Sequence, residues 1–205
     1  MEEKHFAAVL AGQARVAEDI RQSAWTLHER VGQTYDDTRP YGFHLSMVAD
    51  AAMQYGAPVV ADASDVVPLL FGAYYHDSIE DARLTYNDVR RLASSFMTEP
   101  QALMATEIVY ALTNEKGRTR AERANDRYYA GIRTTPYAPL VKLCDRFANM
   151  SYSFRHASGS NHHMRNVYGS EWPHFLQAID ARPTLDGRLL LPPALTQAVE
   201  NLLAP

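Results

Sequence analysis

The stretch His76-Asp77-Ser78-Ile79-Glu80-Asp81 constrains this chain most, because it places one imidazole and three carboxyl groups directly after an apolar run. Burying such groups against an apolar element without partners is costly in free energy. A divalent cation removes that cost, since imidazole nitrogens and carboxylate oxygens are its natural ligands. The stretch therefore predicts half of a metal site, and the rest of the chain has to fold so that it supplies the other half.

Hydrophobic residues recur at intervals of three and four along most of the chain, which is typical of amphipathic helices. The strict alternation of a half-buried strand never persists. The chain is therefore predicted to be all-α. Helices are expected over residues 3–31 with a break near Gly12, and over 43–55, 62–77, 85–96, 100–112, 121–132, 139–154 and 195–203.

Length and composition fit one globular domain: 205 residues, of which 46% are hydrophobic and 21% charged. The net charge of -4 argues against a nucleic-acid partner, which needs a basic face.

A single cysteine cannot form an internal disulfide, which suits a reducing compartment. The polar first residues lack the apolar core of a secretory signal, and no segment is long and apolar enough to span a membrane. We therefore expect a cytoplasmic protein without a membrane partner.

The second half of the metal site has two candidates. His44 begins the helix expected over 43–55, and Asp145 interrupts an otherwise apolar helix face. Taken alone, His44 is better explained as a helix-terminal or core histidine, and Asp145 could be a salt-bridge partner of a neighbouring basic residue. Together with His76 and Asp77 they offer two imidazoles and two carboxylates. Such a set suits a cation of octahedral preference, such as Mn²⁺ or Fe²⁺, with positions left for water or a phosphate oxygen.

Glu80 and Asp81 follow the predicted ligands by one turn. A metal lowers the pKa of its bound water, and a nearby carboxylate can then accept the proton. These two residues are therefore the candidate catalytic groups of a hydrolytic reaction.

The order His44, His76-Asp77, Asp145 resembles that of the HD-domain metal-dependent phosphohydrolases. Within that superfamily the chain is similar to the hydrolase domain of the RelA/SpoT alarmone enzymes and to their small standalone relatives. The similarity covers roughly residues 39–150, with a weaker match at Thr113-Asn114-Glu115-Lys116. Its three main motifs are Pro40-Tyr41-x-x-His44, His76-Asp77-x-x-Glu80-Asp81 and Val141-Lys142-Leu143-x-Asp145-x-x-x-Asn149.

This resemblance implies an HD-type helical bundle with a mononuclear metal site between its helices. It implies a small-molecule substrate, the alarmone (p)ppGpp, whose 3′-diphosphate would be removed to give GDP or GTP and pyrophosphate. The metal would be Mn²⁺, with Fe²⁺ or Co²⁺ as alternatives. The residue roles it implies are metal binding by His44, His76, Asp77 and Asp145, activation of water by Glu80 and Asp81, and substrate contacts by Arg39, Lys142 and Asn149.

The chain departs from the family pattern just before His44. Asp36-Asp37-Thr38-Arg39 stands where the family has Arg-x-x-Asp-Gly, and Gly42-Phe43 replaces Ile-Asn. Both departures fall where the base is recognised, so the identity of the base stays open.

We assign residues 1–154 to the hydrolase core. Residues 155–205, which have no recognised counterpart, are expected to be a helical extension packed on the same domain, as a lid or as a contact of a homo-oligomer.

Two other functions remain open. An HD-type deoxynucleotide phosphohydrolase or triphosphohydrolase is favoured if the basic run Arg118, Arg120, Arg123 and Arg127 faces a 5′-triphosphate instead of solvent. A non-catalytic nucleotide-sensing module with the same fold would be expected to lack at least one ligand. All four ligands, Glu80 and Asp81 are present, which favours an enzyme.

Overall fold

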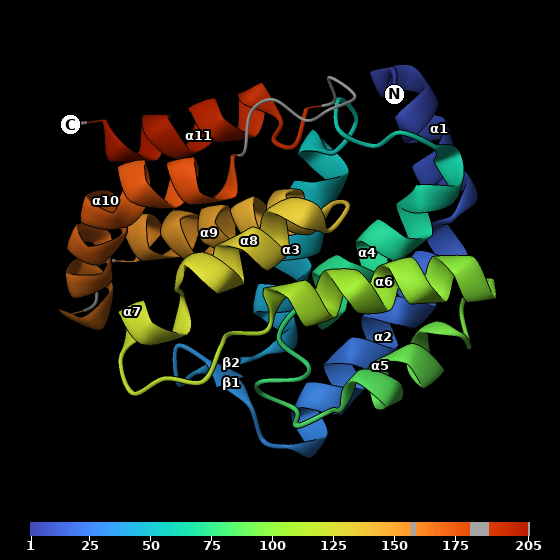
Figure 1. The fold of residues 1–205 in the computed structure, drawn as a ribbon, viewed down its shortest axis with the longest axis horizontal. Helices are drawn as coiled ribbons and strands as arrows, with labels where there is room; N and C mark the ends of the chain where they lie inside the picture. The colour runs from blue at the N-terminus through green and yellow to red at the C-terminus, as the bar shows by residue number, and fades with distance from the viewer. Residues whose placement is uncertain (157–158, 181–188, 205) are drawn as a thin grey trace.

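The computed structural model describes residues 1–156, 159–180 and 189–204, and within them the fold is a helical bundle with one short hairpin (Figure 1). This confirms the all-α prediction. The first part of the chain contains α1 (Glu3–Gly12), α2 (Ala14–Arg30), β1 (Thr34–Tyr35), β2 (Arg39–Pro40), α3 (Gly42–Tyr55), the 3-10 turn η1 (Ala63–Asp65) and α4 (Val66–Tyr75). The second part contains α5 (Tyr86–Ala93), α6 (Glu99–Leu112), α7 (Arg120–Arg123), α8 (Asp126–Thr134), α9 (Ala138–Arg155), α10 (Gly159–Ile179) and α11 (Pro193–Leu203).

Local signals explain where several helices begin and end. The expected break near Gly12 is present, since α1 ends there and α2 begins at Ala14. Thr85 and Asp88 form the reciprocal capping box that starts α5. The helix expected over 121–132 is instead two helices. Asn125 separates them, because its side chain accepts hydrogen bonds from two backbone amides of the first turn of α8.

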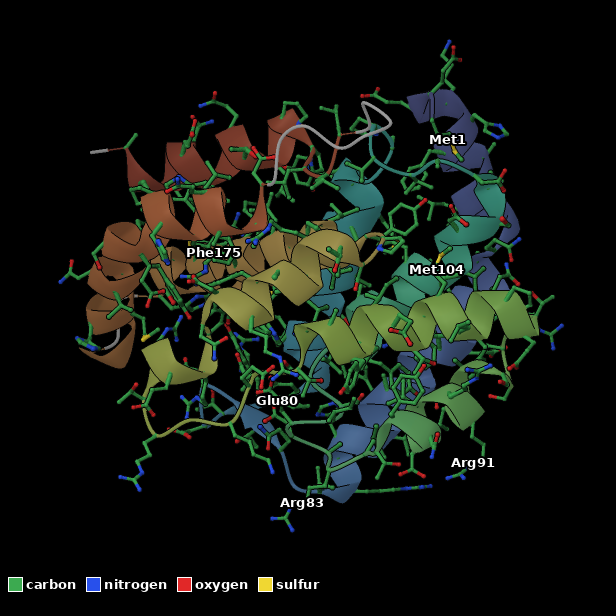
Figure 2. All side chains as sticks on the ribbon, viewed as in Figure 1. Met1, Glu80, Arg83, Arg91, Met104 and Phe175 are labelled. Atoms are coloured by element: carbon green, nitrogen blue, oxygen red, sulfur yellow. The ribbon has the colours of Figure 1, made fainter. Side chains whose placement is uncertain are left out.

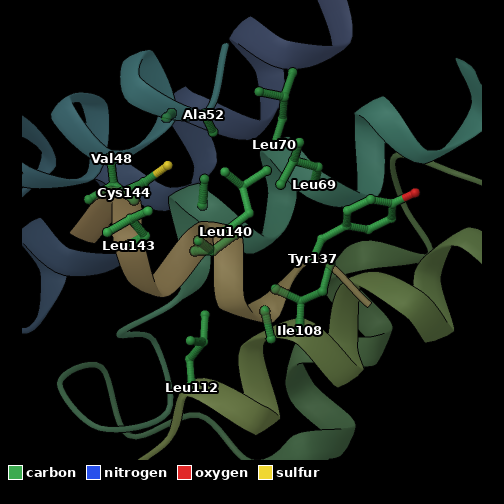
Figure 3. Close-up of a cluster of buried hydrophobic side chains, with 14 of the residues drawn as sticks. Val48, Ala52, Leu69, Leu70, Ile108, Leu112, Tyr137, Leu140, Leu143 and Cys144 are labelled. Atoms are coloured by element: carbon green, nitrogen blue, oxygen red, sulfur yellow. The ribbon is translucent and has the colours of Figure 1, made fainter. Parts of the chain in front are cut away.

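α4 lies in the middle of the bundle, where it packs against α2, α3, α6 and α9 (Figure 1). All of its residues are buried, which explains its continuously apolar sequence. Gly72 lets α6 approach closely, because a Cβ added there would lie 2.5 Å from Cγ2 of Ile108. Around this contact, α3, α4, α6 and α9 contribute the buried side chains drawn in Figure 3, among them Val48, Leu70, Leu112 and Leu140.

The described part of the 155–205 extension forms α10 and α11, while residues 157–158, 181–188 and 205 lie outside the described residues. α10 packs against α8 and α9, and α11 packs against α9 (Figure 1). α10 was not among the expected helices, because Gly159, Gly169 and an internal Pro173 weaken its helical pattern. No helix in the described ranges combines the length and hydropathy needed to cross a membrane.

Candidate metal centre

Three central helices bring the predicted ligands together. His44 lies on the first turn of α3, His76 and Asp77 directly follow α4, and Asp145 lies in α9. The Nε2 atoms of the two histidines are 3.2 Å apart, and Nε2 of His44 is 3.4 Å from Oδ1 of Asp145. The candidate ligand atoms of His44, His76 and Asp145 all lie within 4.8 Å of one another. This is the spacing of groups that could share one cation.

Asp77 joins the same cluster. Its Oδ2 atom is 2.9 Å from Nε2 of His76 and 3.6 Å from Nε2 of His44. The same oxygen accepts a hydrogen bond of 2.5 Å from the hydroxyl of Tyr41. Thus the structure brings all four predicted ligands together, and Tyr41 orients one of them.

The chemistry of this donor set fits a divalent cation. Nδ1 of His76 lies 2.9 Å from the carbonyl oxygen of Ala73. When Nδ1 carries the proton and donates it to this carbonyl, Nε2 is unprotonated and faces the cluster as a ligand atom. Both imidazoles are buried, and two unprotonated ring nitrogens 3.2 Å apart would repel each other unless a cation or proton lay between them. Two nitrogens and two carboxylates are ligands that Mn²⁺, Fe²⁺, Co²⁺ and Zn²⁺ accept. His44, His76 and Asp145, with Asp77 beside them, therefore form a possible divalent-metal site.

The pKa shifts show how strongly the cluster attracts positive charge. Burial alone lowers the pKa of His44, but the carboxylates of Asp145 and Asp77 outweigh it and raise the pKa to about 9. Burial alone raises the pKa of Asp145, but Lys142 and then His44 bring it below its usual range. Burial alone also raises the pKa of Asp77, but His76 and then His44 bring it well below its usual range. Both carboxylates therefore stay ionised at neutral pH, which suits a cation-binding centre.

The candidate catalytic residues lie just beyond the end of α4. Residues 76–81 form turns rather than a continued helix, although the backbone amide of Asp81 still donates to the carbonyl of Asp77 over 2.8 Å. Burial, followed by repulsion from Asp77, raises the pKa of Asp81 to about 6. Glu80, which is labelled in Figure 2, is exposed. Its two carboxylate oxygens accept hydrogen bonds of 2.6 and 2.9 Å from the backbone and side chain of Asn114. Asp81 is thus near enough to Asp77 to be affected by its charge, whereas Glu80 is hydrogen-bonded to Asn114.

A cavity of about 730 Å³ opens onto the cluster. Its wall includes His44, Asp77 and Asp145, and also Lys142 and Asn149. The volume lies in the range typical of small-molecule sites, about 300–1,000 Å³. The cavity is therefore large enough for a nucleotide-sized ligand.

Lys142 and Asn149, the predicted substrate contacts, both touch Asp145. Nζ of Lys142 donates to Oδ2 of Asp145 over 3.1 Å, and Nδ2 of Asn149 donates to Oδ1 over 2.6 Å. The hydroxyl of Tyr35 in turn donates to the amide oxygen of Asn149 over 3.1 Å. The salt-bridge and ligand interpretations of Asp145 are therefore compatible, since its neighbours orient the carboxylate toward the histidines.

Arg39 is set apart from the other predicted site residues. It lies exposed on β2, and its guanidinium packs 4.6 Å from the ring centroid of Phe43 and 5.9 Å from that of Tyr152. It does not belong to the cavity wall.

Several residues of the cavity wall had no role predicted from the sequence. Arg146 directly follows Asp145 and lines the cavity, although no site role was predicted for it. Tyr168 and Glu171 line it from α10, a helix that the sequence pattern did not reveal. Two of the four arginines of the basic run, Arg120 and Arg123, also reach the cavity wall.

The residues of α3, those directly after α4 and those of α9 thus bring two histidines and two aspartates together in one all-α bundle. The structure is similar to that of a metazoan ortholog of SpoT, a protein that hydrolyses ppGpp and plays a role in starvation responses. The match has a TM-score of 0.63 and covers 91% of this chain and 93% of that chain, at 18% sequence identity. The HD-type fold expected from the sequence is thereby confirmed. No family model and no curated protein sequence matches the chain.

Proposed function

We propose that this chain is a metal-dependent phosphohydrolase that removes the 3′-diphosphate from (p)ppGpp or a close 3′-phosphorylated nucleotide. The observation that carries the proposal is the convergence of two buried imidazoles and two carboxylates at the wall of a nucleotide-sized cavity. The similarity of fold to a ppGpp-hydrolysing SpoT ortholog supports the substrate class.

His44, His76, Asp77 and Asp145 would hold one divalent cation, and we propose Mn²⁺, with Fe²⁺ or Co²⁺ as alternatives. When bound, the metal supplies a Lewis acid that lowers the pKa of water and polarises a phosphoryl oxygen. Tyr41 and Asn149 orient the two carboxylates through their hydrogen bonds. Lys142 balances the negative charge of Asp145 and lies in the cavity wall, where it can contact a phosphate.

Asp81 is the proposed general base. Burial raises the pKa of the Asp81 carboxyl above its usual range, which makes its carboxylate a stronger base than that of an ordinary aspartate. It accepts a proton from the attacking water, whose oxygen bonds to the phosphorus next to the ribose 3′ oxygen. The bond between that phosphorus and the 3′ oxygen breaks, pyrophosphate leaves, and the 3′ oxygen takes up a proton. The carboxylate of Glu80, which accepts two hydrogen bonds from Asn114, helps to position the attacking water.

The extension over residues 155–205 is proposed to belong to the same domain as the 1–154 core. Tyr168 and Glu171 of α10 support this assignment, because they line the same cavity as the candidate ligands. The reducing, cytoplasmic setting is part of the same proposal and is supported by the buried free thiol of Cys144.

The proposal is tested by hydrolysis of ppGpp, GTP, dATP, dGTP and NADP in the presence of Mn²⁺, with products separated by anion exchange. GDP and pyrophosphate from ppGpp, with GTP untouched, is the expected result. Asp145→Asn serves as the matched inactive control, because it keeps the size of the side chain and removes the ligand charge. Turnover of ppGpp by Asp145→Asn at the wild-type rate would contradict the site assignment.

A second candidate function is hydrolysis of deoxynucleoside triphosphates. It is favoured by the position of Arg120 and Arg123 in the cavity wall, where they could contact a 5′-triphosphate. The same assay separates the two functions, since turnover of dGTP or dATP with ppGpp untouched would select the second.

A further inference from the structure

A single carboxylate bridges two arginines in the cavity wall. Nε of Arg120 on α7 is 2.9 Å from Oε1 of Glu171 on α10, and a guanidinium nitrogen of Arg146 on α9 is 2.8 Å from Oε2. All three residues line the cavity that holds the candidate metal ligands. We call Arg120 and Arg146 the arginine pair. It is a place where the protein already stabilises an anion between two guanidinium groups.

The two arginines differ in freedom. The side chain of Arg146 is only 8% exposed, and its guanidinium lies 4.8 Å from the ring centroid of Tyr168 and 4.3 Å from that of Phe175, a residue labelled in Figure 2. These contacts fix it in place. The side chain of Arg120 is 53% exposed, so it can turn toward a ligand. The pair thus combines one rigid and one adaptable cation.

The carboxylate of Glu171 is ionised and lies between the two guanidinium groups of the arginine pair. Burial alone raises its pKa, but Arg146 and then Arg120 outweigh burial, so that the net shift is downward. A phosphate group has the same sign of charge and offers oxygen acceptors in a comparable geometry. Phosphate and Glu171 would therefore compete for the exposed guanidinium of Arg120.

We propose that the arginine pair is a second anion subsite, which recognises the 5′-phosphate group of the nucleotide. This inference rests on the proposed function, in which the 3′-diphosphate lies at the metal cluster. A nucleotide phosphorylated on both ribose hydroxyls carries two anionic ends, and the cavity contains both the cluster and the pair. Lys142, another cation of the wall, is already paired with Asp145. The pair therefore sets the preference for 5′-phosphorylated substrates, and Glu171 limits its strength.

The test compares guanosine 3′-diphosphates that carry a 5′-hydroxyl, a 5′-monophosphate or a 5′-diphosphate. We expect Arg120→Gln to raise KM for the 5′-diphosphate about tenfold relative to KM for the 5′-hydroxyl compound, equivalent to about 1.4 kcal/mol. Arg120→Lys should restore part of the preference, because it returns the charge. Glu171→Gln should lower the relative KM of the 5′-diphosphate about threefold, because the competing anion is lost.

Arg127→Gln is the matched control. Arg127 belongs to the same basic run, but its side chain is 86% exposed, pairs with Glu115 and does not line the cavity. It should leave the ratio of KM values unchanged. An Arg120→Gln variant that raises KM equally for all three substrates would show that Arg120 has a structural role only, and the inference would be overturned.

Equilibrium binding separates this inference from the proposed function. Binding of GDP and of guanosine to the Mn²⁺-loaded wild type and variants is measured by calorimetry. We expect Arg120→Gln to weaken GDP binding about tenfold and to leave guanosine binding unchanged. If that result is obtained while no 3′-diphosphate is hydrolysed, the proposed function fails and the subsite stands. GDP binding that is independent of Arg120 would remove the subsite, whatever the enzyme hydrolyses.

Discussion

Tyr41 offers a sharp test of the metal centre, because one of its atoms can be removed without disturbing its ring. Its hydroxyl donates to Oδ2 of Asp77 over 2.5 Å, and burial, followed by Asp77, raises the pKa of this phenol so that it remains a donor. Its ring stacks on His28 with 4.9 Å between centroids. Tyr41→Phe keeps the stacked ring and deprives a predicted ligand of its hydrogen bond.

The expected loss follows from the charge on the acceptor. A hydrogen bond to an ionised group contributes about 1.5–3 kcal/mol, which corresponds to about 10- to 150-fold in a binding constant. Partners that orient metal ligands contribute about 10- to 100-fold to metal affinity. We therefore expect Tyr41→Phe to bind Mn²⁺ about 10- to 100-fold more weakly than wild type, with turnover largely restored at saturating Mn²⁺. Calorimetry and a Mn²⁺ titration of turnover measure the two effects.

Tyr75→Phe is the matched control. Its hydroxyl donates to Oγ of Ser23 over 2.7 Å, so this variant also loses a hydrogen bond of a largely buried tyrosine, but one that does not reach the cluster. It should lower the free energy of unfolding and leave the affinity for Mn²⁺ unchanged. A Tyr41→Phe variant that binds Mn²⁺ within twofold of wild type would refute the assigned role of the hydroxyl.

Three further changes test other parts of the site. Asp145→Asn should abolish metal retention and turnover together, and metal content measured by elemental analysis alongside the hydrolysis assay checks this. Asp81→Asn should keep the metal but lower turnover by about 10²- to 10⁴-fold, as for a lost general base; normal turnover would exclude that role. Burial is the main cause that lowers the pKa of His28 from 6.5 to about 4 in the folded protein. Between pH 6.5 and 4, the unfolded chain therefore binds more protons at His28 than the folded protein does. The free energy of unfolding should therefore fall by up to about 3 kcal/mol as pH drops from about 6.5 to 4, and urea titrations of wild type and His28→Phe should show a weaker pH dependence in the variant.

The parts of the fold with strong local signals could be predicted from the sequence. The capping box of Thr85 and Asp88 predicts the start of α5, and the apolar run before His76 predicts a buried helix. The order of His44, His76-Asp77 and Asp145 predicted that separate helices would converge, and they do. These features are local or rest on residue types that are costly to bury alone.

Other features depend on contacts that no short segment encodes. α10 contains Gly169 and Pro173, which disfavour a helix in isolation, and its packing on α8 and α9 overrides that preference. The bridge from Glu171 to Arg120 and Arg146 joins three helices, so periodicity could not reveal it. The position of Arg39 follows from the short hairpin of β1 and β2, where it packs on Phe43 instead of entering the cavity.

α10 connects the C-terminal part of the chain to whatever occupies the cavity. Glu171 and Tyr168 lie in the cavity wall, while other residues of the same helix pack against α8 and α9. A nucleotide that contacts this wall would suppress the local opening through which backbone amides exchange with solvent. Hydrogen exchange of α10 should therefore slow when GDP binds, whereas that of α5, which lies outside the cavity wall, should stay constant. The last third of the chain would then report on ligand occupancy even where it makes no direct contact with the reacting phosphate.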